Sequence, residues 1–298
     1  MADAYVLTPG GYKPAANVHH IPPGHLVKMD GLVAELHHPQ TGFVRVLGTT
    51  PQRGGGPLLP TNVLPRPPGA PAPLARQQAV RPVGAPVPFP EVNGWISYTG
   101  WTNTTGTPIS SFTTAWTVPQ EPNNHGPQTV FLFNGIQNAT MIYQPVLQWG
   151  PSAAGGGQKW SVACWYADSQ TGHSYYSSLV DVAAGSALTG VMTMTATAAG
   201  LCDYTAEFVG IANTALPISQ VQELTWANET LEAYQVQSRD DFPAAPYTDF
   251  SSIVIRTGDA VPAGFQWNCK SDHPETGSAV ELVDGSPQNG AVRITYQP

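Results

Sequence analysis

A single amide interrupts an apolar strand pattern near the middle of the chain. In the run from Ile142 to Trp149, alternation places Gln144 on the same face as Ile142 and Val146. An amide among apolar neighbours needs hydrogen-bond partners or a ligand, because its burial without them costs free energy. Gln144 is therefore a candidate functional residue. The alternatives are a hydrogen bond across the sheet and an exposed position on its outer side.

A carboxyl group occupies a comparable place in residues 225–236. If this segment is a strand, Asn228, Thr230, Glu232 and Tyr234 point to one face. On a concave face, the carboxyl of Glu232 can act as a general base with a raised pKa. A solvated glutamate is the alternative interpretation. Several good helix formers in the segment also leave its strand assignment open.

Other catalytic and metal-binding patterns are absent from the sequence. It contains no Ser-His-Asp elbow, HExxH motif, phosphate loop or dinucleotide fingerprint. Cys164, Cys202 and Cys269 are an odd set without CxxC spacing, so we expect no metal, no cofactor and at most one intrachain disulfide. For Cys164, a small buried thiol is favoured over a nucleophile, because no histidine is visibly placed to activate it.

The elements that must position these side chains are short strands. Charged residues make up only 11% of the chain, and Gly and Pro number 30 each, a composition typical of strands and turns. Strands are expected at 111–118, 129–134, 141–149, 159–166, 187–198, 204–210, 225–236, 252–256 and 290–296. The pattern predicts an all-β domain over residues 93–298. Its expected architecture is an antiparallel β-sandwich with two large sheets, of the concanavalin or jelly-roll kind.

The first 92 residues are predicted to form an N-terminal arm outside the core of that domain. Residues 51–90 hold twelve prolines and are expected to be a Pro-rich linker. Residues 25–36 and 42–47 can each form strands, but they are too small to fold alone. The start of the chain shows no basic and apolar segments of a Sec-type signal peptide, and the compartment is left open.

Charge divides the chain at the same place. Residues 1–92 hold seven Lys/Arg and four Asp/Glu, a formal +3, whereas residues 93–298 hold five and sixteen, a formal −11. Five of the eight histidines also lie in the arm. The arm is therefore predicted to be an intramolecular electrostatic partner of the domain, with a solvated tail as the alternative. An acidic domain without a long apolar run predicts neither a nucleic-acid nor a membrane partner.

The order of segments in residues 93–298 resembles that of the glutamic peptidases of the eqolisin family. The resemblance rests on the segments 110–119, 133–137, 141–144, 165–166, 184–186 and 246–250. It implies a sandwich of two seven-stranded sheets and an acid-acting endopeptidase with a polypeptide substrate. Members of the family are typically secreted and are made with a basic propeptide, a role in which the arm would fit.

The family's catalytic glutamate has two possible placements in this chain. One aligns residues 201–208 with the family's Ala-Glu-Phe string and puts Ile211 at the catalytic position. The other aligns residues 227–234, keeps every intervening strand, and puts Glu232 there. The second placement is preferred. The resemblance then implies that Glu232 activates a water and that Gln144 stabilises the oxyanion.

The same alignment assigns a set of substrate-binding positions. These are Gln137, Trp160, Cys164, Trp165 and Tyr234. Three neighbouring carboxylates of the family's cleft are replaced, by Gln137, Trp160 and Cys164. Their loss removes like-charge repulsion that would raise the pKa of a central glutamate. The dyad is therefore predicted either to work at a different pH or not to work at all.

Two other functional classes fit the composition. Eight tryptophans and eleven tyrosines can line the groove of a noncatalytic, lectin-like sandwich that binds glycan, although core packing should account for most of them. A structural or surface-assembly protein is a third interpretation.

The attachment of the arm to the domain is expected to depend on pH. Protonation of its histidines below about pH 6.5 is expected to strengthen the attachment first. Carboxyl protonation near pH 4 is expected to weaken it afterwards.

Overall fold

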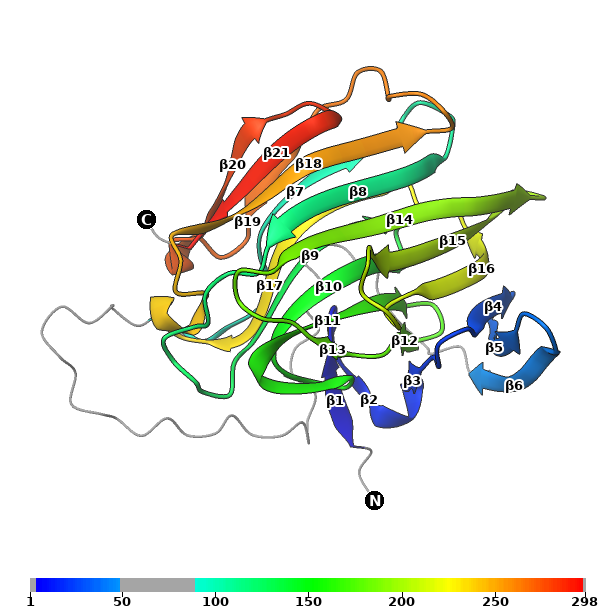
Figure 1. The fold of residues 1–298 in the computed structure, drawn as a ribbon, viewed down its shortest axis with the longest axis horizontal. Helices are drawn as coiled ribbons and strands as arrows, with labels where there is room; N and C mark the ends of the chain where they lie inside the picture. The colour runs from blue at the N-terminus through cyan, green and yellow to red at the C-terminus, as the bar shows by residue number, and fades with distance from the viewer. Residues whose placement is uncertain (1–3, 49–88, 297–298) are drawn as a thin grey trace, which may run out of the picture.

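Two large β-sheets face each other in the computed structural model, which describes residues 4–48 and 89–296 (Figure 1). The nine-stranded sheet contains, in spatial order, β19 (Asn268–Ser271), β7 (Val92–Thr102), β17 (Trp226–Val236), β9 (Thr129–Gln137), β10 (Met141–Ser152), β11 (Gly155–Asp168), β12 (Ser174–Tyr176) and β3 (Val18–His20), with β13 (Val180–Asp181) also paired to β11. The ten-stranded sheet contains β20 (Ala279–Asp284), β21 (Gln288–Thr295), β18 (Tyr247–Thr257), β8 (Ile109–Thr117), β14 (Ala187–Ala198), β15 (Leu201–Phe208), β16 (Leu216–Gln222), β4 (Leu26–Asp30), β5 (Val33–His38) and β6 (Gly42–Gly48). A separate hairpin is formed by β1 (Tyr5–Thr8) and β2 (Gly11–Pro14), and three single-turn 3-10 helices occur at Ala15–Asn17, Arg239–Asp241 and Pro274–Thr276.

This architecture confirms the predicted all-β sandwich, and each strand expected in residues 93–298 overlaps an observed one, although β18 begins five residues before its expected start. The segment 25–36 forms two strands, β4 and β5. The ambiguous segment is strand β17, which lies between β7 and β9 near the middle of its sheet. Its inward-facing side chains, Ala227, Leu231 and Ala233, are buried in the core, so tertiary packing overrides their helix propensity. The two sheets are larger than the seven-stranded pair that the family resemblance implies.

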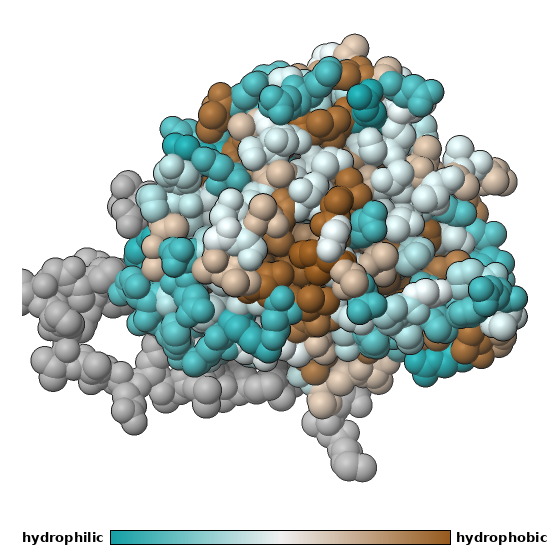
Figure 2. Space-filling view, in the orientation of Figure 1, coloured by the Kyte–Doolittle hydropathy of each residue, from teal (hydrophilic) through white to brown (hydrophobic). Residues whose placement is uncertain are grey.

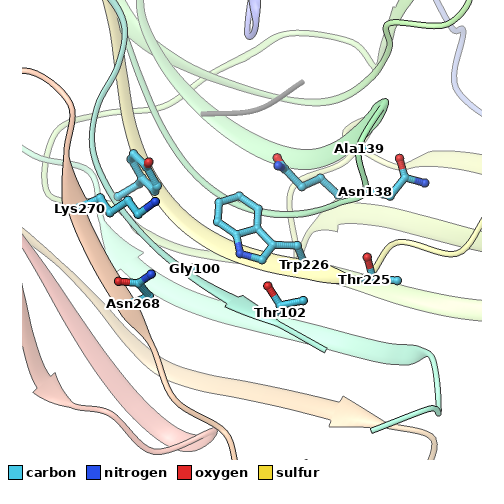
Figure 3. Close-up of a pocket in the computed structure, with 10 residues that line it drawn as sticks. Gly100, Thr102, Asn138, Ala139, Thr225, Trp226, Asn268 and Lys270 are labelled. Carbon is cyan, nitrogen blue, oxygen red and sulfur yellow. The ribbon is translucent and has the colours of Figure 1, made fainter. Parts of the chain in front are cut away.

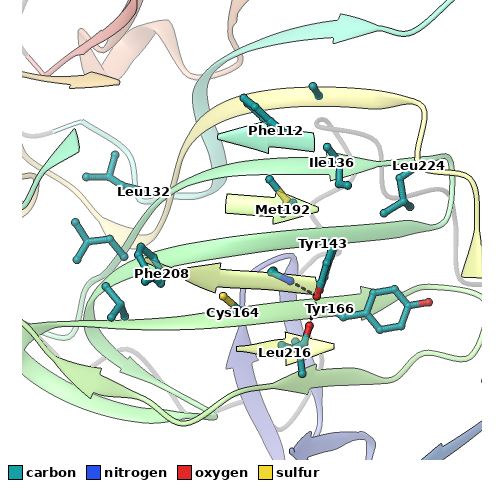
Figure 4. Packing of buried hydrophobic residues seen from close by; sticks show 14 of the residues in the cluster. Phe112, Leu132, Ile136, Tyr143, Cys164, Tyr166, Met192, Phe208, Leu216 and Leu224 are labelled. Atoms are coloured by element: carbon teal, nitrogen blue, oxygen red, sulfur yellow. Dashed lines mark hydrogen bonds between the residues drawn. The ribbon is translucent and has the colours of Figure 1, made fainter. Parts of the chain in front are cut away.

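Apolar side chains from both sheets fill the space between them (Figure 4). Phe112 and Met192 come from the ten-stranded sheet, and Leu132 and Ile136 come from the nine-stranded sheet, all at most 1% exposed. The hydroxyl of Tyr143 ties the layers together, because it donates to the Leu216 carbonyl and accepts the Ala206 N–H. The inward face of the nine-stranded sheet is therefore committed to packing.

The opposite face of the nine-stranded sheet, called the outer face below, carries a second apolar cluster. Phe131, Phe133 and Val146 belong to this cluster, and the hairpin β1–β2 packs on it through Leu7 and Tyr12. Alternation along each strand separates the two clusters, since successive side chains point to opposite faces. The outer face is thus the surface on which ligands can reach strand-borne side chains.

The N-terminal arm joins both sheets, which corrects the expectation that it lies outside the core. Strand β3 pairs in parallel with β12, and β4 pairs in parallel with β16. Ile21, Val27 and Met29 are at most 3% exposed within the core cluster. The short arm strands are stable here because each extends an existing sheet edge. The boundary at residue 93 stays a prediction, and nearly all of the linker expected at 51–90 falls outside the described residues.

Substitution of Gly190 by Ala is expected to destabilise the protein by about 1–3 kcal/mol. Gly190 lies on β14 between the sheets, where an added Cβ would stand 2.7 Å from Asn134 Oδ1 and 2.9 Å from Trp116 Cη2. The side chains of Asn134, Trp116 and Pro145 around this position leave little room for relaxation in a close-packed interior. Urea unfolding of the variant measures the loss. An unchanged midpoint would contradict the packing seen at this contact.

Surface hydropathy divides into an apolar band and a polar surround in the view of Figure 2. The band crosses the middle of this face, and hydrophilic residues cover much of the periphery. Phe43, Val44 and Val46 on the edge strand β6 are between 43% and 55% exposed. Within residues 4–48 and 89–296, no helix is long and apolar enough to cross a membrane.

Candidate active site on the outer face

Glu232 lies on the outer face of β17 and is completely buried. Its Oε1 accepts hydrogen bonds from the Tyr234 hydroxyl at 2.5 Å and from the Gly10 N–H at 2.7 Å. The Trp95 side chain lies beside the same carboxyl group and favours its ionised form. Its other oxygen, Oε2, is buried without a hydrogen-bond partner in the described structure. One carboxyl oxygen is therefore anchored, and the other is buried with an unused capacity to accept a hydrogen bond.

The surroundings of Glu232 raise its pKa to about 7. Burial is the largest cause, because removing a carboxylate from water favours its neutral form. Hydrogen bonds from Tyr234 and Gly10, together with the Trp95 side chain, favour the ionised form and oppose burial. A carboxyl group that titrates near neutrality can exchange a proton with a reacting water.

The hairpin β1–β2 covers this carboxyl group. Its tip bears Gly10 and Gly11 with positive φ angles of 89° and 105°, a backbone conformation that suits glycine. Its sides are fastened to the sheet, since Ala153 N–H donates to the Leu7 carbonyl at 2.7 Å and the Tyr12 ring meets Tyr234 edge-on at 6.1 Å. A segment of polypeptide therefore already lies across the outer face, with a backbone N–H on Glu232.

Gln144 also points to the outer face, where it pairs in register with Trp165 of β11. It is 1% exposed, and its Oε1 has no hydrogen-bond partner in the described part of the chain. The sequence predicted that it shares a face with Ile142 and Val146, which both belong to the outer cluster, but left its burial open. A buried amide oxygen without a partner is costly, which marks this position as a candidate for ligand contact.

The structure does not bring Gln144 and Glu232 into contact. The register aligns Glu232 with Phe131 and Phe131 with Gln148, so Gln144 lies two strands away and four residues further along. Four residues span about 13 Å along a strand and two strand spacings about 10 Å across the sheet. The Glu232 carboxyl is also engaged by Tyr234, on the side away from Gln144. The predicted pair is therefore on one face but is not assembled as a dyad.

Gln148, which was not predicted as a site residue, is the amide in register with Glu232. Its Nε2 donates to the carbonyls of Gly150 and Gly155 at 2.7 and 3.0 Å, and its Oε1 accepts from Ser152. These contacts hold the turn between β10 and β11. The spacing of Gln144 and Gln148 by four residues already places both on one face, but only strand pairing decides which of them is opposite Glu232.

The remaining predicted substrate-binding residues divide between the two faces of the sheet. Trp165 and Tyr234 lie on the outer face, 1% exposed, where Trp165 stacks on Tyr176 at 4.9 Å. Trp160 and Cys164 belong to the core cluster between the sheets, where Trp160 packs against Trp149 at 5.5 Å. Their placement on the inward face excludes them from a groove that contains Glu232. Burial also raises the pKa of the Cys164 thiol well above its usual value, as expected for an inert cysteine.

Gln137 lines an open pocket of about 400 Å³ at one end of the outer face (Figure 3). The Trp226 ring occupies the centre of this pocket, with Asn268 and Lys270 of β19 beside it. Trp226 also stacks on Trp95, with ring centroids 6.0 Å apart. Because Trp95 contacts Glu232, the pocket and the carboxyl group share one aromatic wall.

A second buried carboxyl group, Glu229, lies on the same strand but faces the ten-stranded sheet. Its Oε1 accepts from the Thr114 hydroxyl at 2.6 Å, and its Oε2 has no hydrogen-bond partner among the described residues. Burial raises the pKa of Glu229 well above its usual value, so the folded protein holds it neutral. The inward position makes Glu229 a natural control for Glu232.

Replacement of Glu229 by Gln is expected to change how stability depends on pH. Folding raises this pKa, so the folded protein binds the proton more tightly than the unfolded chain does. Wild-type stability should therefore fall as pH rises above the ordinary value of 4.5, by up to about 1.4 kcal/mol per pH unit relative to the variant. Urea unfolding of both proteins from pH 4 to 7 measures the difference. Parallel curves would show that Glu229 is ionised in the fold.

A histidine pair joins the arm to the domain beside the same sheet. His19 of β3 and His173 share a hydrogen bond of 2.9 Å and stack at 5.1 Å. Burial, His173 and Arg45 lower the pKa of His19 to about 4, and burial together with Lys13 lowers the pKa of His173. The expectation that histidine charging strengthens attachment of the arm is therefore wrong for His19, because charging it there opposes the docked state.

Comparisons with known proteins give only distant matches. No protein-family model matches the chain, and no curated protein matches it in sequence. SCP-B, a member of the eqolisin family of peptidases solved with the tripeptide Ala-Ile-His, superposes with a TM-score of 0.40 at 13% identity, covering 70% of this chain and 100% of that chain. The CBM2 module of Lactobacillus casei BL23 phage J-1 evolved Dit gives a TM-score of 0.30 at 14% identity, covering 52% and 70%. The similarity to the peptidase is a weak, fold-level one.

Proposed function

We propose that this protein is an acid-acting endopeptidase in which Glu232 is the general base, and that the present conformation is its covered form. The observation that carries the proposal is the 2.7 Å hydrogen bond from the Gly10 N–H to Glu232 Oε1. Through this bond the turn of the β1–β2 hairpin, a segment of the same chain, lies against a buried carboxyl group whose pKa is about 7. A substrate peptide in place of the hairpin would present its backbone to the same group.

In the proposed reaction, the Glu232 carboxylate takes a proton from a water as the water attacks the scissile carbonyl carbon. The C–N bond then breaks, and the same proton passes to the leaving amine. Displacement of the hairpin would let water reach Glu232 and return its pKa toward the ordinary 4.5, which suits a base that works in acid.

The developing oxyanion needs hydrogen-bond donors close to the base. The Tyr234 hydroxyl already donates to Glu232, and the Trp95 side chain lies beside the same group, so they are the nearest donors for this task. Gln144 was predicted for this role from the family resemblance. In the present geometry it is better placed to bind the substrate chain further along the outer face.

The direct test is hydrolysis of a denatured protein by the purified full chain from pH 2 to 7, with and without an aspartic-peptidase inhibitor. We expect inhibitor-resistant cleavage in the acid range. A Leu7→Asp variant should cleave faster, because a carboxylate at this 7%-exposed position loosens the hairpin. Absence of cleavage by both proteins at every pH would refute the proposal.

A further inference from the structure

The pocket around Trp226 has the composition of a saccharide site rather than of a peptide subsite. We propose that it binds a sugar ring, with the ring against the Trp226 indole and its hydroxyls toward the side chains of β19 and β7. The pocket of about 400 Å³ is large enough for one or two sugar units and lies within the usual range for small-molecule sites. This proposal does not depend on Glu232 or on peptide hydrolysis.

Trp226 is a rigid platform. Trp95 stacks on it at 6.0 Å with an interplanar angle of 19°, and Tyr98 meets it edge-on at 6.3 Å. Below it, Gly100 leaves the space that the ring needs, because a Cβ there would stand 2.0 Å from Trp226 Cζ2. The ring nevertheless stays half-buried and lines the open pocket. A preorganised aromatic surface loses little entropy when a ligand stacks on it.

Polar side chains surround this platform without being used by the fold. Asn268 and Lys270 on β19 lie opposite Gly100 and Tyr98 in register, so both point to the outer face beside Trp226. They are exposed, as is Thr102, and none of the three forms a side-chain hydrogen bond or ion pair with the part of the chain that the structure describes. An amide and a hydroxyl both donate and accept, which matches the neighbouring hydroxyl groups of a sugar.

A buried aromatic side chain of a peptide fits this lining less well. It would cover the amide and hydroxyl groups without pairing them, and each unpaired group costs about 1–3 kcal/mol. Sugar hydroxyls would pair with them instead. Among the described residues, no carboxylate lines the pocket and Lys270 is its one cation. A sugar that carries a carboxylate can therefore bind as well as a neutral one, with Lys270 facing its charge.

The experiment is calorimetric titration of the full chain with cellotetraose, chitotetraose and tetragalacturonate. We expect saturable binding of at least one, weakened about ten-fold or more by Trp226→Ala. Gly100→Ala keeps the tryptophan but drives a Cβ into its ring, and should weaken binding similarly. Lys270→Gln should weaken only tetragalacturonate. Phe43→Ala, which removes an exposed aromatic ring on β6, should change nothing.

Thermal unfolding establishes that each variant is folded. Trp226→Phe, which keeps a smaller ring, should retain part of the affinity. This variant still tests the role of the ring if Gly100→Ala does not fold. Binding of none of the three oligosaccharides, equal binding by wild type and Trp226→Ala, or tighter binding of N-acetylphenylalanine amide would overturn the saccharide site. Retained binding by Glu232→Gln would separate this site from the hydrolytic one.

Discussion

Replacement of Glu232 by Gln is expected to abolish peptide hydrolysis while leaving the fold intact. The amide has nearly the shape of the carboxyl group, and its oxygen can still accept the Gly10 N–H and the Tyr234 hydroxyl. It cannot take a proton from water near neutral or acid pH, so the base is lost. General-base catalysis typically contributes about 10²–10⁴-fold, and we expect a loss in this range.

The measurement is kcat/KM on an unfolded protein substrate, in the Leu7→Asp background so that the hairpin does not limit the rate. The matched control is Glu229→Gln, which alters a buried carboxyl group three residues away on the inward face of the same strand. It should leave kcat/KM within about two-fold at the pH of best activity, because it touches no substrate. Equal activity of Glu232→Gln and wild type would exclude Glu232 as the base.

Two further variants separate the amide predicted from sequence from the donors seen in the structure. Tyr234→Phe removes the hydroxyl that contacts Glu232 and should lower kcat, whereas Gln144→Ala should act mainly on KM. If Gln144→Ala alone caused a large loss of kcat, the catalytic pair would instead be Glu232 and Gln144. The two side chains would then have to come together after the hairpin is displaced.

The arm is expected to stay docked between about pH 5 and 7 and to detach below about pH 4. Docking lowers the pKa of His19 to about 4 and also lowers that of His173, so both resist protonation while docked. Below their ordinary value of 6.5, protonation therefore favours the detached arm. Arg45 lowers the pKa of His19 and Lys13 lowers that of His173, so both cations add to this effect, and Asp168 raises the pKa of Lys13.

Glu232 acts in the opposite direction over part of this range. Docking raises its pKa to about 7, so docking takes up a proton between pH 7 and about 4.5 and becomes more favourable there. Below about pH 4.5 this contribution no longer grows, while the opposing contribution of His19 grows until about pH 4. The balance places release near pH 4.

Hydrogen exchange of residues 4–22, corrected for the intrinsic effect of pH, measures the docked fraction. Protection should be high at pH 5–7 and lost near pH 4 in wild type. His19→Gln should retain protection at lower pH, while His25→Gln, which lies outside the histidine pair, should follow wild type. Protection of wild type that persists at pH 3 would show that the histidine pair does not control the arm.

Local sequence pattern predicted much of the scaffold, because alternation is a property of neighbouring residues. It located β14 with its observed bounds and β8, β10 and β17 within a few residues. It missed β7, whose glycines at positions 94 and 100 interrupt the alternating pattern that marks a strand. It also treated the arm as separate, since its composition gives no information on the sheet edges that stabilise β3 and β4.

For the candidate site, the sequence placed Gln144 on one strand face with Ile142 and Val146, and it placed Thr230 and Tyr234 on the face of Glu232 if residues 225–236 form a strand. It left the burial of both polar groups open. The tertiary structure decided the rest. Strand register placed Gln148 rather than Gln144 in the same row as Glu232, with Phe131 between them, and sheet orientation turned Trp160 and Cys164 toward the core. Burial of Glu232 in the assembled fold raised its pKa, against the hydrogen bond from Gly10 of the hairpin. These outcomes depend on contacts between residues up to 222 positions apart, and no local pattern encodes such pairings.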